Sequence, residues 1–197
     1  MRSVGELVAE LMRDRIVWEE SGGGVTFSGG EPLAQPEFLI ACLEACRAAG
    51  IHAAVDTCGL APREVAVAVA ARADLLLWDV KHTDEAHHRA LTGAPLEPIL
   101  ANLAAVGKVG VPLWLRIAVI PGLNDDDANL ATLARLAATT PNVRRVSLLP
   151  YHRTGAGKLD RLGRAGDSAR LAIPPAARMD ELAAMFAATG IPTAVGG

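Results

Sequence analysis

Aromatic residues are scarce in this 197-residue chain, at 4% of the sequence, whereas hydrophobic residues of all kinds make up 51%. The core must therefore be aliphatic, and the length is sufficient for one domain with a core of its own. Cysteine is also scarce: three residues, an odd number, argue against a disulfide framework. We therefore expect a chain of the reducing cytoplasm.

The sequence has no block of basic residues and no long apolar segment. Its formal net charge is −3, and apolar runs such as Val65–Ala71 and Leu75–Trp78 are far shorter than a membrane span. The first residues, Met1–Glu6, have no unbroken apolar stretch and do not resemble a signal peptide. We expect neither nucleic acid nor membrane among the partners.

Strand and helix signals alternate along the chain. Short apolar runs bounded by turn residues predict strands at residues 25–28, 51–56, 74–80, 111–120, 143–148 and 191–195. Apolar periodicity, with prolines at helix starts, predicts helices at residues 4–17, 36–49, 62–72, 126–139 and 174–189, and helical segments within 84–91 and 97–106.

This series of strands and helices with short connections predicts a parallel sheet with right-handed crossovers. We expect an α/β fold, a partial (β/α) barrel with parallel strands, in a single domain over residues 1–197. The glycine- and charge-rich segment 155–168 is interpreted as a mobile loop and not as a domain boundary.

Polar side chains gather where the predicted strands end. The chemistry of parallel sheets lies at the carboxyl ends of their strands. Five successive strands contribute such residues: Ser28–Glu31, Asp56-Thr57, Asp79–His82, Arg116 within its strand, and Tyr151–Arg153. This gathering predicts a functional site, because a scaffold would carry such residues on outward helix faces.

The sharpest motif is Gly29-Gly30-Glu31-Pro32. Two glycines let the backbone approach a ligand, and the glutamate can accept hydrogen bonds from an ammonium group. A plain strand-to-helix turn with a solvated glutamate explains these four residues equally well. The longer segment, Glu19–Leu33, closely resembles that of activases of the pyruvate formate-lyase type, which are radical S-adenosylmethionine (SAM) enzymes.

Further matches follow in the family's order, from about residue 4 to residue 160. Asp56–Gly59 is similar to the family's Asp-Thr-x-Gly stretch, and Asp79–Lys81 to its Asp-x-Lys stretch. The segment from Arg116 to Asp125 is similar to the family's Arg…Pro-Gly-x-x-Asp stretch, and Pro150–His152 to its Pro-Tyr/Leu-His stretch. Each match is weak alone, but together they are specific for activating enzymes of glycyl radical enzymes.

The resemblance implies that Gly29, Gly30 and Glu31 hold the amino group of SAM. Lys81 and Arg116 are cations suited to the SAM carboxylate. His152 could stack on or hydrogen-bond the adenosyl part.

A cluster of oxygen ligands is the second part of the implied site. Asp56, Thr57 and Asp79 could hold the monovalent cation that the family can bind beside SAM, although a plain hydrogen-bonded cluster explains them equally well. Asp79 could also bind the ribose hydroxyls or pair with Lys81. Three further histidines are interpreted as helix-start and surface residues: His82, His87 and His88.

Radical SAM chemistry needs a [4Fe–4S] cluster, held by cysteines usually spaced Cys-x₃-Cys-x₂-Cys. This chain has Cys42 and Cys46 in the first spacing, but Ala49 stands where the third cysteine would be. Both lie within a predicted helix and are interpreted as packing residues, and Cys58 as a free thiol lining the pocket. We therefore expect no iron–sulfur ligands in this chain. We also expect that the first βα unit, which carries the cluster loop in the family, is missing.

The resemblance implies an enzyme, a radical SAM activase that generates a 5′-deoxyadenosyl radical and installs a glycyl radical on a partner enzyme. The partner's glycine loop peptide would bind at the open side of the barrel, and a flavodoxin or ferredoxin would supply the electron. Without the cluster motif we expect this chain to be inactive alone.

Two alternatives stay open. The first is a non-catalytic module that binds only SAM or only the partner protein. The second is a metal-dependent barrel hydrolase that uses Asp56, Asp79, His82 and His152.

Overall fold

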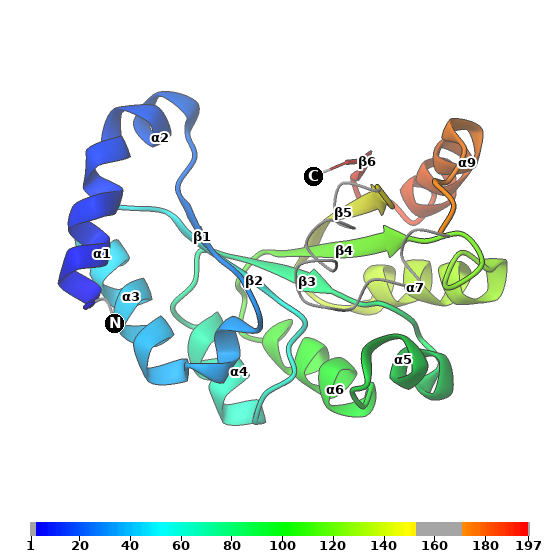
Figure 1. The fold of residues 1–197 in the computed structure, drawn as a ribbon, viewed down its shortest axis with the longest axis horizontal. Helices are drawn as coiled ribbons and strands as arrows, with labels where there is room; N and C mark the ends of the chain where they lie inside the picture. The colour runs from blue at the N-terminus through cyan, green and yellow to red at the C-terminus, as the bar shows by residue number, and fades with distance from the viewer. Residues whose placement is uncertain (1–2, 153–170, 197) are drawn as a thin grey trace. The chain divides into compact units, whose positions relative to one another are not determined.

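The structure, a computed structural model, describes residues 3–152 and 171–196 (Figure 1). Its strands form one six-stranded parallel sheet in chain order. They are β1 (Val25–Phe27), β2 (Ala53–Thr57), β3 (Leu75–Asp79), β4 (Leu113–Val119), β5 (Val143–Pro150) and β6 (Thr193–Val195).

This sheet confirms the predicted α/β fold with a partial barrel of parallel strands. Within the described residues the sheet is open, with β1 and β6 at its edges. The missing first βα unit and the single domain stay predictions. The expected mobile loop at residues 155–168 lies outside the described residues.

Helices follow each of the first five strands, close to the predicted positions. They are α3 (Pro36–Ala48), α4 (Arg63–Ala70), α5 (Glu85–Thr92), α6 (Glu97–Val106), α7 (Asp127–Thr139) and α9 (Ala176–Ala187). None of the helices in the described parts of the chain is both long and apolar enough to cross a membrane.

The N-terminal stretch differs from the single helix predicted at residues 4–17. It contains α1 (Val4–Leu11), a 3₁₀ turn η1 (Met12–Asp14) and α2 (Arg15–Ser21). A reciprocal capping box between Ser3 and Glu6 starts α1. No residue of the three elements is buried. Their half-buried residues recur on one helical face, and α1 of this stretch contacts α3.

Contacts within the chain define two compact units, and the strands of the sheet contribute to both. The first unit comprises residues 1–79, 97–114 and 140–143, and the second comprises residues 80–96, 115–139 and 144–197. Each unit is described by itself below.

In the first unit, α3 contacts α4, and α4 contacts α6. The register pairs Val55 with Phe27 and with Leu76, so these side chains share one face of the sheet. That face is the more buried one, whereas residues on the other face, such as Leu75 and Leu77, are half-buried. The helices therefore cover the face that carries Val55.

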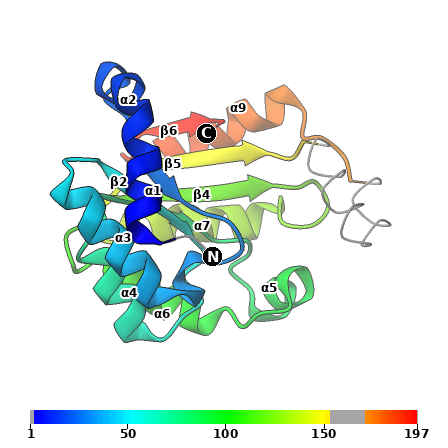
Figure 2. The same ribbon diagram turned by 60° about the vertical axis from the view of Figure 1, so that its left-hand side comes forward.

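In the second unit, α9 contacts both α7 and β6, and Figure 2 shows β5 and β6 side by side beside α9. Alternate residues of β4, Leu115, Ile117 and Val119, are buried, which is the period of a strand with one covered face. Phe186 of α9 is fully buried and is one of only three phenylalanines in the chain. The remaining core of this unit is aliphatic, as the composition predicts.

Candidate S-adenosylmethionine site

The turn after β1 exposes its backbone. Gly29 and Gly30 have φ angles of +95° and +44°, which side-chain-bearing residues rarely adopt. A Cβ added at either glycine would meet nothing within 4 Å, so a ligand has room to approach this backbone. Glu31 then caps the 3₁₀ turn η2 (Pro32–Ala34) by accepting a hydrogen bond from the Leu33 N–H.

The Glu31 carboxylate binds the segment that follows β2. Its Oε1 accepts a 2.5 Å hydrogen bond from the Thr57 hydroxyl and a 3.0 Å bond from the Leu33 N–H. Its Oε2 accepts from both the N–H and the thiol of Cys58, each at 3.0 Å. Glu31 therefore joins the turn after β1 to the turn after β2.

These four hydrogen bonds use the acceptor capacity of the carboxylate. An ionised carboxylate has about four lone-pair positions, two on each oxygen, and each Glu31 oxygen already accepts twice. An arriving ammonium group would have to displace one donor. The weakest of the four is the Cys58 thiol, since S–H is a poor hydrogen-bond donor.

The Cys58 thiol is held in its protonated form. Burial raises its pKa to about 11, and the hydrogen bond to the Glu31 carboxylate adds to this effect. A thiolate is the form that binds iron or attacks an electrophile. Cys58 is therefore a hydrogen-bond donor to Glu31 at neutral pH.

The three predicted cation ligands do not share one face of the sheet. Asp56 pairs in register with Leu77, two residues before Asp79, so both carboxylates project from the less buried face. Thr57 pairs with Trp78 on the opposite, buried face, where its hydroxyl donates to Glu31. The geometry brings Asp56 and Asp79 to one face and leaves the Thr57 hydroxyl apart from them.

The cationic residues predicted to bind SAM belong to the second unit, whereas the residues described above belong to the first. Lys81 follows the end of β3, and Arg116 lies in the middle of β4; both are half-buried. Their segments are neighbours, because the Val80 N–H donates to the Arg116 carbonyl at 3.3 Å. His152 follows β5 and is exposed.

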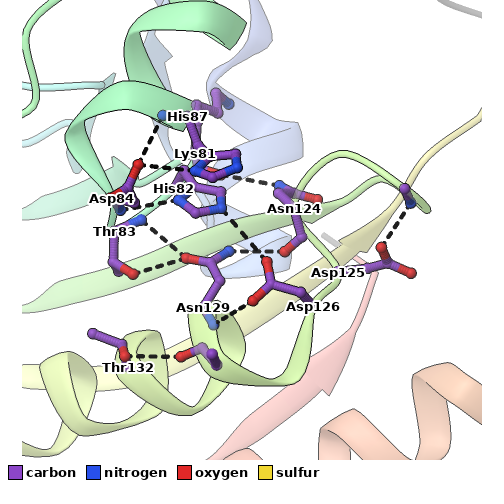
Figure 3. Close-up of polar contacts among 12 residues, drawn as sticks. Lys81, His82, Thr83, Asp84, His87, Asn124, Asp125, Asp126, Asn129 and Thr132 are labelled. Carbon is purple, nitrogen blue, oxygen red and sulfur yellow. Dashed lines mark hydrogen bonds and ion pairs between the residues drawn. The ribbon is translucent and has the colours of Figure 1, made fainter.

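The interpretation of two histidines as surface residues is wrong. His82 and His88 are only 4% and 2% exposed, and His87 alone of the three is exposed. His82 Nδ1 accepts a hydrogen bond from the Asp84 N–H at 2.9 Å, and its ring stacks on that of His87 at 4.7 Å (Figure 3). Sequence spacing did not reveal the burial of His88 because α5 is mostly polar, and His82 lies in the segment before that helix.

The cysteines do not fit an iron–sulfur cluster. Cys42 and Cys46 are both fully buried on α3, which confirms their interpretation as packing residues. Burial raises the pKa of both thiols, the opposite of what a metal-binding thiolate needs. Over residues 3–152 and 171–196, no three His, Cys, Asp or Glu side chains are grouped to hold a metal ion.

Buried asparagines are the part of this region that sequence reasoning missed. Asn124 and Asn129, 2% and 3% exposed, hold the loop after β4 against the segment after β3. An isolated asparagine near a Pro-Gly turn reads as a solvated turn residue, and only the fold reveals its burial.

The radical SAM superfamily profile matches residues 2–134 of this chain. The trans-4-hydroxy-L-proline dehydratase activating enzyme of Clostridioides difficile is 41% identical over 197 residues, which are 99% of this chain and 65% of that protein. A solved domain of a pyruvate-formate lyase-activating enzyme from Bacteroides vulgatus superposes with a TM-score of 0.75 at 34% identity, covering 89% of this chain and 99% of that domain. The chain belongs to the radical SAM superfamily.

Within the superfamily, the predicted resemblance to activating enzymes of glycyl radical enzymes is confirmed. The pyruvate formate-lyase-activating enzyme of Clostridium pasteurianum is also 41% identical, over 157 residues that are 80% of this chain and 66% of that protein. The chain thus spans about two thirds of the length of these two curated relatives.

Proposed function

We propose that this chain forms the SAM-binding part of an enzyme that activates a glycyl radical enzyme. The observation that carries the proposal is the open, left-handed backbone at Gly29 and Gly30 beside a carboxylate fixed by its own chain. The names of the relatives support the same function.

The amino-acid end of SAM needs acceptors for its ammonium group and donors for its carboxylate. We assign the ammonium group to the carbonyls of Gly29 and Gly30, with Glu31 supplying negative charge close by. Glu31 can accept directly from the ammonium group once the Cys58 thiol turns away. Lys81 and Arg116 bind the carboxylate through charge-assisted hydrogen bonds.

The remaining assignments concern the nucleoside and a cation. His152, exposed at the end of β5, stacks on or hydrogen-bonds the adenosyl part. The carboxylate of Asp79 binds the ribose hydroxyls, or it joins Asp56 in holding a monovalent cation, since both lie on one face of the sheet. Thr57 contributes indirectly, by holding Glu31.

When SAM is bound at a reduced [4Fe–4S] cluster, SAM and the cluster together supply a radical that abstracts a hydrogen atom. The cysteines of this chain do not fit that cluster, so the chain's own residues are assigned only to binding and orienting SAM. The activated partner would be a glycyl radical enzyme that presents its glycine loop peptide, which Arg116 could contact instead of SAM. The electron donor would be a flavodoxin or a ferredoxin, in the cytoplasm.

Calorimetric titration of the chain with SAM and with 5′-methylthioadenosine tests this function. The second ligand keeps the nucleoside and sulfur but has no ammonium or carboxylate group. We expect Lys81→Ala to weaken SAM binding by about tenfold, about 1.4 kcal/mol, and to leave 5′-methylthioadenosine binding unchanged. Lys108→Ala, at an exposed lysine of the first unit, is the matched control. Equal affinities of the two ligands for the wild-type chain would contradict the proposal.

A further inference from the structure

The Asn124 side chain binds three backbone groups from two strand ends. Its Nδ2 donates to the Lys81 carbonyl at 3.0 Å and to the Ala118 carbonyl at 2.6 Å, and its Oδ1 accepts from the Ile120 N–H at 2.8 Å (Figure 3). Lys81 follows β3, whereas Ala118 and Ile120 belong to the end of β4 and the residue after it. Asn124 therefore fixes the backbone of Lys81 to the end of β4.

Asn129, near the start of α7, adds to these contacts, and the two asparagines together are called the clamp below. Its Nδ2 donates to the Asn124 carbonyl at 2.8 Å, and its Oδ1 accepts from both the N–H and the hydroxyl of Thr83 at 2.9 Å. The Asn129 N–H donates in turn to the Asp126 carboxylate. The backbone from Lys81 to Thr83 is thus held at both of its ends by buried amides.

Only a primary amide of this length makes the contacts of Asn124. The site requires two N–H donors and one acceptor within a short reach, which the carboxylate of aspartate cannot supply. A buried amide is unfavourable unless it is satisfied, and the fold accepts two of them here. Buried, fully hydrogen-bonded amides of this kind are expected where the direction of one functional side chain must be fixed.

We propose that Asn124 and Asn129 are positioning residues that aim the Lys81 ammonium group at the carboxylate of SAM. The inference rests on the proposed function, because the role of Lys81 does. Neither asparagine is assigned to touch the ligand: both hold the backbone of the segment from Lys81 to Thr83, and through it they set the direction of the lysine side chain.

The first experiment reads the position of Lys81 without any ligand. Brief acylation of the folded chain, followed by mass spectrometry, gives the reactivity of Lys81 relative to that of exposed Lys108. We expect the isosteric change Asn124→Asp to alter this ratio by about threefold or more, because a carboxylate repels both carbonyls. Asn129→Asp keeps its Thr83 contacts and loses only the bond to Asn124, so we expect a smaller change in the same direction.

Asn102→Asp is the matched control. Asn102 is also buried and also donates its amide to two backbone carbonyls, those of Gly59 at 2.9 Å and Ala61 at 2.8 Å, and it belongs to the first unit. The control is expected to lower stability without changing the labelling ratio. An unchanged ratio in both Asn124→Asp and Asn129→Asp would overturn the proposal.

The second experiment titrates the variants with SAM and 5′-methylthioadenosine. A positioning role predicts about tenfold weaker binding of SAM to Asn124→Asp, with unchanged binding of 5′-methylthioadenosine. Equal losses for both ligands, or no loss for either, would show a merely structural role and overturn the inference. A wild-type chain that does not bind SAM would instead remove the proposed function, while the labelling ratio still decides whether the clamp orients Lys81.

Discussion

The Thr57 hydroxyl donates a 2.5 Å hydrogen bond to the Glu31 carboxylate, which lies 26 residues earlier in the chain. The same hydroxyl accepts a 2.8 Å bond from the Gly59 N–H. Thr57 therefore connects Glu31 to the turn after β2, and its side chain is only 3% exposed. Only a hydroxyl-bearing residue can donate and accept in this way from such a position.

Replacing Thr57 by Val should lower the free energy of unfolding by about 1–3 kcal/mol, because a buried acceptor and a buried N–H lose their partner. Thr57→Ser keeps the hydroxyl and should cost clearly less. Urea denaturation of both variants measures the difference. Equal losses would mean that the methyl group, and not the hydrogen bonds, stabilises this turn.

Gly59 cannot accept a side chain. Its φ angle is +76°, and an added Cβ would overlap Cζ2 and Cη2 of the buried Trp78 ring. We expect Gly59→Ala to lower the free energy of unfolding by about 3 kcal/mol or more. Gly50→Ala, at a φ of +69° with open space around it, should lose only about 1 kcal/mol. Thermal melts that rank the two variants equally would contradict the steric argument.

His88 should make the chain sensitive to acid. Burial holds its pKa below the ordinary value of about 6.5. Neither of its ring nitrogens has a hydrogen-bond partner among the described residues. The folded chain therefore favours the neutral imidazole ring of His88. This preference stabilises the fold above about pH 6.5, and the stabilisation is lost as the pH falls through the folded-state pKa of His88.

Melting temperatures at pH 7.5 and pH 5.5 test this effect. We expect His88→Leu to lose less stability between the two pH values than the wild-type chain does. His52→Gln, a change at an exposed histidine, is the control and should keep the wild-type dependence on pH. If His88→Leu responds to acid as the wild type does, other groups govern the acid sensitivity.

The cysteines give a prediction about iron. Because Cys42 and Cys46 are fully buried, anaerobic reconstitution with iron and sulfide should leave iron well below four atoms per chain. Cys42→Ala should leave the iron content unchanged. Cys42→Ser should lower the free energy of unfolding by about 1–3 kcal/mol, because the serine hydroxyl would be buried. A reduced [4Fe–4S] EPR signal that responds to SAM and disappears in Cys42→Ala would contradict this assignment.

The sequence was sufficient to predict most of the elements, and the reason is periodicity. From residue 25 onward the described strands and main helices match the predicted ranges within a few residues because apolar runs, prolines and glycines mark them directly, whereas the helix predicted at residues 4–17 is divided by a 3₁₀ turn. Cys42 and Cys46 were interpreted correctly because they lie one helical turn apart beside Leu39 and Leu43, which are also buried.

Contacts between distant segments were not predictable in the same way. The Glu31 motif indicated an acceptor for a ligand, but its partners in this structure, Thr57 and Cys58, come from another strand end. The burial of His88 and Asn124 likewise depends on tertiary packing, which single-residue preferences do not encode. Sequence reasoning therefore located the strand ends that carry the predicted site but not the hydrogen bonds that hold them.

The close packing of Trp78 on Gly59 gives this chain a built-in optical probe. Trp78 is fully buried, whereas the other two tryptophans, Trp18 and Trp114, are half-buried. Because the ring lies against the turn whose preceding residue, Cys58, donates to Glu31, any ligand that displaces that thiol alters the surroundings of a shielded indole. Intrinsic fluorescence can thus follow events at the Glu31 turn without an added label.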